Sequence, residues 1–240
     1  MNPLRPSAPI AAEALLPGDP ARALFLAQEL LVKPKMSNHA HGLWGYWGET
    51  EDGRELTIQS LGLGGPSAAM VLAQLAGLGV KRAVGVGTCR ALDPGLRLGD
   101  LMMVSEAIGA DGVSRELSAG PAEAGARPAG DPATLHPDAQ LGAALSSAAE
   151  ADGVRPGCVA STDLLGELDG RAPEHWRERG AAALEMVTAP LFATGERCGI
   201  AVAALLAVSD AGGEAIAEEP LQEASIRMGR LALAAMSSSD

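Results

Sequence analysis

Aromatic side chains are scarce in this sequence, because Phe, Trp and Tyr together make up 2% of its 240 residues. A core organised around large rings is therefore excluded, and Ala, Leu and Val must fill the interior. Such small side chains suit helices packed closely against a sheet. With 47% hydrophobic residues, the chain is long enough and apolar enough to form one large α/β domain.

Positive charge is also in deficit. The chain carries 18 Lys and Arg against 30 Asp and Glu, a formal net charge of −12. This balance argues against nucleic acid or an anionic membrane surface as a partner, since both attract cationic proteins. Any anion-binding site must therefore be basic locally.

Long apolar runs, cysteine pairs and metal-ligand clusters are missing as well. No apolar run reaches the roughly 18 residues that a membrane-spanning helix needs, and the N-terminal segment lacks the layout of a signal peptide. Cys89, Cys158 and Cys198 have no CxxC spacing, so we expect reduced thiols in the core of a cytoplasmic protein. His39 and His41 form the only close histidine pair, and without a third ligand they predict no metal site.

Short apolar runs alternate with amphipathic segments along the chain, which is the pattern of an α/β protein. Strands are expected at 14–16, 42–50, 54–61, 80–92, 99–108, 157–161, 181–186 and 200–208. Helices are expected at 21–31, after the turn at 62–67, and at 138–151, 173–179, 187–197 and 220–235.

This order predicts three α/β/α layers around a mixed, largely parallel sheet. We expect residues 1–13 to be a loose N-terminus and residues 14–240 to form a single domain. Residues 109–135 are rich in Gly, Ala and Pro without periodicity, and they are expected to form a long mobile loop.

Two Gly-rich segments stand out, LLPGDPARA (15–23) and VKRAVGVGTCRAL (80–92). In each, we expect a short buried strand to end in a turn whose glycines let backbone N–H groups approach an anion. Ligands of parallel sheets bind beyond the carboxyl ends of the strands. Gly18, Thr88, Met186 and Asp210 fall at such ends, so the sequence predicts one site there.

Six blocks carry a resemblance to a known family: LLPGDPARA, NHAHGLWGYWG, GLGGPSAAMV, VGVGTCRAL, ALEM and LAVSD. Their order and spacing resemble the nucleoside phosphorylase family, which includes the hexameric purine nucleoside and uridine phosphorylases. The resemblance runs from about residue 14 to residue 235. It implies a pentosyltransferase that forms ribose 1-phosphate and free base, with inorganic phosphate as co-substrate and no cofactor. It also implies a homohexamer built from dimers.

The resemblance assigns phosphate binding to Gly18, Arg22 and Thr88, through a backbone N–H, a guanidinium and the N–H with hydroxyl, respectively. It places Met186 under the ribose and makes Asp210 the acid that protonates the leaving purine, with Glu185 and Ser209 as neighbouring nucleoside-binding residues. Each role has an ordinary structural alternative. Arg22 suits a solvated helix face, Thr88 and Asp210 suit helix caps or turns, and Met186 suits a core.

Several family positions are substituted. The family's phosphate-binding Arg falls on Gly85, an Arg supplied by the neighbouring subunit falls on His41, and the Glu that grips the ribose hydroxyls falls on Val187. An Arg that assists the acid falls near Leu221, and residues 1–13 lack the family's histidine. Each lost charge-assisted hydrogen bond is worth roughly 1.5–3 kcal/mol, so reduced activity is expected. Arg90 is a candidate to restore the lost phosphate contact, and His41 keeps one nucleoside-side donor.

Three functions remain open. The first is a purine nucleoside phosphorylase. Within this first function, a uridine phosphorylase is less favoured than a purine nucleoside phosphorylase, because the Gln-x-Arg pair that binds the uracil edge is missing from residues 162–171. The second function is a nucleosidase that uses water, favoured by the missing arginines. The third is a non-catalytic paralogue that binds a base or nucleoside, favoured by Val187 in the sugar site.

Overall fold

A computed structural model describes residues 2–119, 131–165 and 173–237. The strands are β1 (Glu13–Leu16), β2 (Val32–Asn38), β3 (Gly45–Glu49), β4 (Glu55–Gln59), β5 (Arg82–Ala91), β6 (Leu101–Gly109), β7 (Ala133–Leu135), β8 (Arg155–Ser161), β9 (Ala183–Glu185), β10 (Ala201–Ala211) and β11 (Glu214–Ala215). The helices are α1 (Pro20–Leu30), α2 (Gly64–Gly77), α3 (Gly112–Ser118), α4 (Ala139–Ala151), α5 (Pro173–Glu178), α6 (Thr188–Cys198) and α7 (Glu218–Ser237), with a 3-10 turn at Ala40–Gly42.

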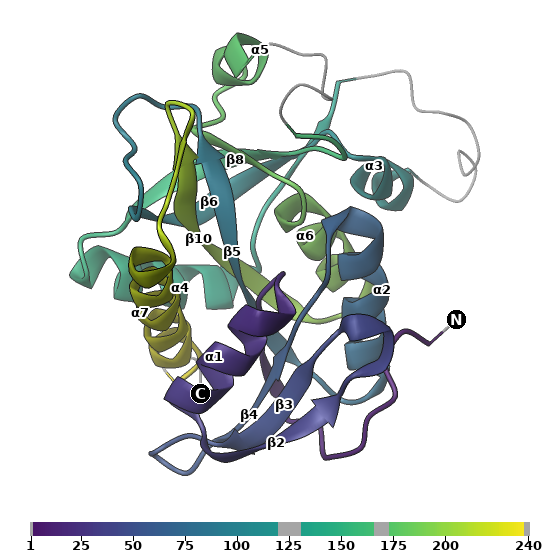
Figure 1. Ribbon diagram of the computed structural model, residues 1–240. Coiled ribbons are helices and arrows are strands. Elements are labelled where there is room, and N and C mark those ends of the chain that lie inside the picture. The colour runs from purple at the N-terminus through teal and green to yellow at the C-terminus, as the bar shows by residue number, and fades with distance from the viewer. Residues whose placement is uncertain (1, 120–130, 166–172, 238–240) are drawn as a thin grey trace.

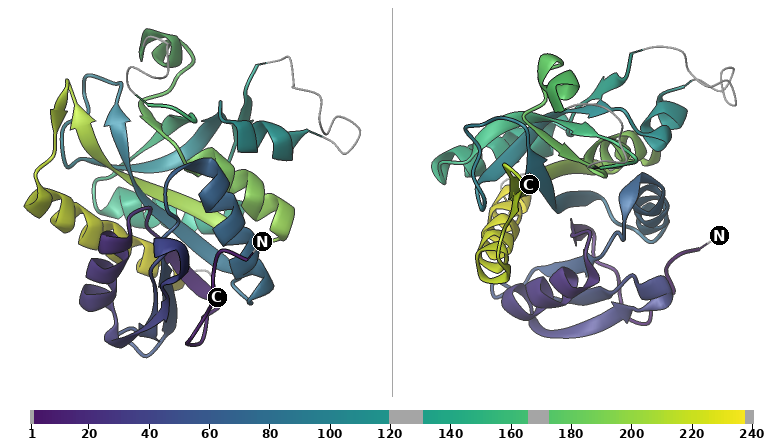
Figure 2. Two further views of the ribbon diagram at one scale, coloured as in Figure 1. Left: turned by 45° about the vertical axis from the view of Figure 1, so that its right-hand side comes forward. Right: turned by 45° about the horizontal axis from the view of Figure 1, so that its top comes forward.

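The helices cover both faces of the sheet, which confirms the predicted three layers. Helices α1, α4 and α7 lie on one face, and α2 and α6 lie on the other (Figures 1 and 2). Each face has its own core of Ala, Leu and Val side chains, with Leu26, Leu145 and Met228 in the first and Leu72, Leu75 and Leu191 in the second. Small side chains fill most of both cores in place of aromatic ones, as expected.

The strands form one mixed sheet in the order β11-β10-β6-β8-β9-β5-β1-β4-β3-β2, with β7 added to β6. The central strands β4, β1, β5 and β10 are parallel neighbours, as predicted. The β3–β4 hairpin and the β10–β6 pair are antiparallel. Because β10 also pairs with β5, the strands β5, β10, β6, β8 and β9 close into a ring of paired strands.

Strand β5 corrects the expectation that the short buried strand within 80–92 ends in a Gly-rich turn. It continues through Gly85 and Gly87 as far as Ala91. The reason is the pairing on both sides, with Gly85 opposite Leu16 of β1 and also opposite Ala204 of β10. Strands β1 and β10 both pair with Gly85, and β10 continues beside Gly87 opposite Leu206, so the segment stays extended where the local sequence favours a turn.

The expectation of a loop over 109–135 is also wrong for part of its length. Helix α3 begins after Asp111, whose carboxylate accepts a hydrogen bond from the Ser114 N–H at 2.8 Å. Residues 133–135 form β7 on the edge of β6. Residues 120–130 lie outside the described part of the chain, as do residues 166–171 of the segment 162–171. The sequence analysis also missed strand β2, which follows directly after α1.

Residues 2–12, expected to be loose, form neither helix nor strand but are attached to the domain. Leu4 is 2% exposed. Its N–H donates to Gln74 Oε1 at 2.8 Å, and its carbonyl accepts from Gln74 Nε2 at 2.9 Å. The N–H of Ala11 donates to Thr57 Oγ1 at 2.8 Å.

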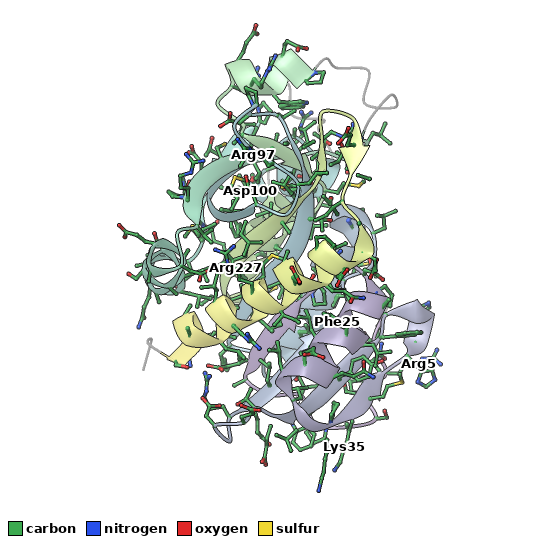
Figure 3. All side chains as sticks on the ribbon, turned by 60° about the vertical axis from the view of Figure 1, so that its left-hand side comes forward. Arg5, Phe25, Lys35, Arg97, Asp100 and Arg227 are labelled. Carbon is green, nitrogen blue, oxygen red and sulfur yellow. The ribbon has the colours of Figure 1, made fainter. Side chains whose placement is uncertain are left out.

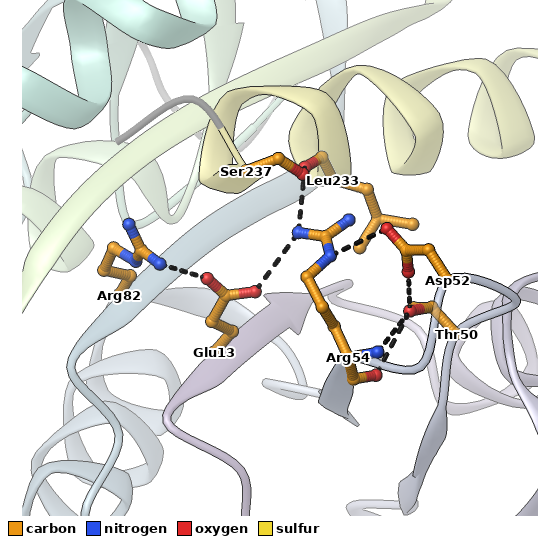
Figure 4. Close-up of polar contacts among 7 residues, drawn as sticks. All are labelled: Glu13, Thr50, Asp52, Arg54, Arg82, Leu233 and Ser237. Carbon is orange, nitrogen blue, oxygen red and sulfur yellow. Dashed lines mark hydrogen bonds and ion pairs between the residues drawn. The ribbon is translucent and has the colours of Figure 1, made fainter. Parts of the chain in front are cut away.

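An ion cluster joins the amino ends of the strands (Figure 4). The carboxylate of Glu13 on β1 pairs with Arg82 on β5 and lies 3.7 Å from Nη1 of Arg54, next to β4. The same Nη1 donates to the Leu233 carbonyl of α7 at 3.3 Å. These contacts tie two strands and a helix together at the end of the sheet from which the strands start.

The cysteines differ in burial. Burial raises the pKa of Cys89 to about 12 and that of Cys158 to about 11, so both thiols stay protonated and unreactive near neutral pH. Cys198 is exposed at the end of α6, which corrects the expectation of three core thiols. Within the described ranges, no helix is long and apolar enough to cross a membrane, and no group of three or more His, Cys, Asp or Glu side chains is placed to hold a metal ion.

Candidate active site

A cavity of about 400 Å³ opens at the carboxyl ends of β1, β5 and β9, between the beginnings of α1, α2 and α6. The polar groups of its lining belong to Gly18, Asp19, Arg22, Thr88, Glu185 and Thr188. The other lining side chains are mostly apolar or glycine. Of the residues expected in the site, Gly18, Arg22, Thr88, Glu185 and Met186 meet at this cavity.

The β1–α1 turn forms one side of the cavity. The Pro17 carbonyl accepts a hydrogen bond from the Leu61 N–H at 2.8 Å, and the Gly18 carbonyl accepts one from the Gly62 N–H at 3.0 Å. These bonds hold the turn against the segment that leads into α2. Asp19 caps α1 by accepting from the Ala21 N–H at 2.9 Å. The Gly18 N–H itself donates to no acceptor within the described residues, so it is available to a ligand.

Arg22 extends from the first turn of α1 into the cavity lining. Burial lowers its pKa, while the nearby charges of Asp19 and Glu218 oppose that shift. The guanidinium remains protonated at any physiological pH. Over residues 2–119, 131–165 and 173–237 it has no hydrogen bond or ion pair. A cation held at a cavity wall without a partner is suited to bind an anion.

Strand β5 supplies Thr88 from its interior, so the alternative of a helix cap for Thr88 is wrong. Thr88 lines the cavity beyond Gly85 and Gly87. A Cβ on Gly87 would come within 2.9 Å of Leu206 Cδ2. Glycine at position 87 therefore lets Leu206 pack directly against strand β5 beside the cavity. With glycine at position 85, the back of the cavity is apolar and formed by Leu191, Ala204 and Leu206.

Glu185 lines the cavity, but its carboxylate is already engaged. It accepts from Ser161 Oγ and from the N–H groups of Val187 and Thr188, the latter two at 2.6 and 2.9 Å. These contacts satisfy the first amides of α6, whose N-cap Val187 offers no side-chain acceptor. Burial raises the pKa of Glu185, and the hydrogen bonds act in the opposite direction.

Met186 follows β9, half-buried, and its Cε lies 3.8 Å from the position that a Cβ on Gly64 would take. It therefore packs at the beginning of α2 instead of deep in the core. Gly62, Leu63 and Gly64 line the same wall. Sequence reasoning did not assign these three residues to the site, although the GLGGPS turn was the signal that could have placed them there.

Asp210, Ser209 and Arg90 lie outside the cavity lining. Asp210 pairs in register with Arg90, whereas Ala207 pairs with Thr88. At about 3.3 Å per residue along a strand, Arg90 and Asp210 stand about 7 Å beyond Thr88. Arg90 Nη2 lies 2.8 Å from Asp210 Oδ2, and Ser209 Oγ donates to the Cys89 carbonyl at 3.3 Å. Asp210 belongs to β10, so it caps no helix.

His41 also lies outside the cavity lining. It is exposed in the 3-10 turn Ala40–Gly42 with left-handed backbone angles, φ 56° and ψ 20°. The contact expected of this residue is one to a neighbouring subunit, so the single chain neither adds it to the site nor removes it.

Comparisons with known proteins place the chain in a family. The profile of the phosphorylase superfamily matches residues 14–237. A DeoD-type purine nucleoside phosphorylase of Caldanaerobacter subterraneus subsp. tengcongensis is 30% identical over 229 residues, which cover 93% of this chain and 94% of the relative. Enzymes of the same name from Alkaliphilus metalliredigens and Geobacillus kaustophilus are 30% and 31% identical, each over 88% of this chain and over 88% and 86% of their own lengths, respectively.

The match spans nearly all of the described strands and helices, including the segments that line the cavity. The chain therefore belongs to the phosphorylase superfamily, as a member of its nucleoside phosphorylase family.

Proposed function

We propose that this protein catalyses phosphorolysis of purine nucleosides. Phosphate attacks the anomeric carbon, the bond from that carbon to the base nitrogen breaks, and ribose 1-phosphate and the free base leave. The similarity to relatives named purine nucleoside phosphorylases supports this reaction class. The observation that carries the proposal is the convergence of Gly18 and Arg22, from the β1–α1 segment, and of Thr88, from β5, on one cavity.

The phosphate side is the better supplied part of the proposed site. Arg22 offers a guanidinium without a partner among the described residues, Gly18 offers an N–H, and Thr88 offers its hydroxyl. Phosphate is well matched by a planar guanidinium that donates two parallel hydrogen bonds. Among the described residues that line the cavity, Arg22 is the only cation, because position 85 is glycine. This supports a weaker phosphate affinity than two guanidinium groups would give.

The sugar side is less polar. Met186 offers an apolar surface to the ribose ring, and Val187 contributes no hydrogen bond from its side chain. The Glu185 carboxylate stabilises the start of α6. We therefore assign Glu185 a structural role at this side of the cavity and not direct binding of the ribose hydroxyls. Asp210 is proposed as the general acid. Asp210 donates its proton to a ring nitrogen of the leaving purine. The purine ring takes up the electron pair of the broken bond.

The test is a comparison of base release with and without phosphate. Adenosine, inosine, guanosine and uridine are incubated with the protein, and free base and ribose 1-phosphate are measured by chromatography. We expect phosphate-dependent release from the purine nucleosides with equal amounts of ribose 1-phosphate. Release without phosphate would instead establish a nucleosidase, and binding without any release would establish a non-catalytic paralogue.

We also propose that the protein is a homo-oligomer built from dimers. Leu63, just before α2, lines the cavity and yet is 84% exposed, and Met70 on α2 is 40% exposed. A second copy over this face would cover both side chains and narrow the mouth of the cavity. Sedimentation equilibrium tests this, with a monomer at micromolar concentration as the contrary result.

A further inference from the structure

We propose that Arg90 is a positioning residue, which orients the Asp210 carboxyl group for proton transfer to the leaving base. The inference rests on the proposed function, since it gives Arg90 a role in the step assigned to Asp210. It also replaces the sequence-based hypothesis that Arg90 binds phosphate.

The backbone places the two residues side by side. Strands β5 and β10 pair in unbroken parallel register up to Val208 opposite Cys89, and the register then shifts so that Asp210 lies opposite Arg90. A shift of this kind is a β-bulge, which redirects the side chains that follow it. The Ser209 hydroxyl fixes the bulge by donating to the Cys89 carbonyl at 3.3 Å.

The ion pair holds one edge of the carboxylate and leaves the other free. Both Arg90 Nε, at 3.0 Å, and Arg90 Nη2, at 2.8 Å, bind the same oxygen, Asp210 Oδ2. Oδ1 accepts no hydrogen bond from the described residues. Two donors on one oxygen restrain rotation of the carboxyl group, so Oδ1 is the atom that carries the proton toward a ligand.

The same contacts argue against a phosphate role for Arg90. Its donors Nε and Nη2 are used by Asp210, and Arg90 is absent from the cavity lining, whereas Arg22 lines the cavity without a protein partner. The two arginines therefore divide the work. Arg22 faces the attacking anion, and Arg90 faces the acid on the side where the base departs.

The test compares a leaving group that needs a proton with one that does not. Inosine requires protonation of its base, whereas 7-methylguanosine already carries a positive charge on its purine ring and departs as a neutral base. We expect Arg90→Ala to lower kcat for inosine roughly 10- to 100-fold. For 7-methylguanosine we expect kcat to stay within about threefold of the wild type, and the KM for phosphate to be unchanged.

Further variants keep the result interpretable. Arg90→Lys keeps a charge near Oδ2 and should recover part of the loss, which also guards against misfolding of Arg90→Ala. Because Arg90 acts through Asp210, the double variant R90A/D210N should be no slower than D210N. Arg97→Ala removes an exposed arginine from the β5–β6 loop (Figure 3) and serves as the charge-matched control.

Three results would overturn the inference: equal losses of kcat for both nucleosides, a higher phosphate KM as the main defect, or additive effects in the double variant. Failure of the proposed function looks different, since the wild type would then show no phosphate-dependent base release from either nucleoside.

Discussion

Gly85 on β5 faces Leu191 on α6 so closely that a Cβ added to Gly85 would stand 3.1 Å from Leu191 Cδ1. Both residues line the cavity, and Leu191 is 2% exposed. Position 85, onto which the family resemblance places a phosphate-binding arginine, is therefore an apolar contact in this protein.

Gly85→Ala tests this contact. The new methyl group pushes Leu191 toward the cavity, because the empty space lies on that side. We expect the KM for the nucleoside to rise severalfold, with stability changed by no more than about 1 kcal/mol. Gly77→Ala is the matched control, since nothing lies within 4 Å of its added Cβ. Steady-state kinetics and urea unfolding measure both effects, and an unchanged KM would show that the cavity does not bind the nucleoside.

Arg22→Ala tests the anion site. Loss of the guanidinium should reduce kcat/KM for phosphate roughly 10- to 100-fold, since a charge-assisted hydrogen bond contributes about 1.5–3 kcal/mol. Binding of nucleoside without phosphate should change little. Arg197→Ala, an exposed arginine at the end of α6, controls for the change in net charge. Equal losses in the two variants would remove Arg22 from the phosphate site.

Glu185→Gln tests the buried carboxyl group through the pH dependence of unfolding. Burial raises the pKa of Glu185 in the folded protein, above an unfolded value of about 4.3. The folded state then binds more protons in the interval between the two values, so this contribution to stability is greatest below the unfolded pKa and is lost as the pH rises. We expect the free energy of unfolding of the wild type minus that of Glu185→Gln to fall from pH 4 to pH 8. Chemical denaturation across this range measures it, and a difference that rises with pH would contradict the assignment.

Glu13→Ala tests the ion cluster at the opposite end of the sheet. Removal of the shared carboxylate leaves the guanidinium groups of Arg82 and Arg54 without their common anion, at a place where Glu13 is 9% exposed. We expect a loss of about 2 kcal/mol in unfolding free energy, with catalytic constants unchanged because the cavity lies at the other end of the strands. Glu49→Ala, on an exposed position of β3, should cost less than about 0.5 kcal/mol.

The α/β class, the order of most elements and two of the segments that supply the cavity, residues 15–23 and 80–92, could be predicted from the sequence alone. Periodicity and glycine-rich turns are local properties, and so the helix at Pro20–Leu30, the β3–β4 hairpin and the PGDP turn were predictable from neighbouring residues alone.

Contacts that depend on pairing between distant segments could be identified from the three-dimensional structure alone. Gly85 is a strand residue because β1 and β10 flank it, and Gly87 is one because β10 pairs beside it, against the turn that their local sequence favours. The carboxylate of Glu185 is engaged because the fold brings Ser161 and the start of α6 to it. Arg90 meets Asp210, 120 residues away along the chain, because a bulge in β10 shifts the register by which the two strands pair. Long-range hydrogen bonding and packing set these contacts, and no local pattern in the sequence encodes them.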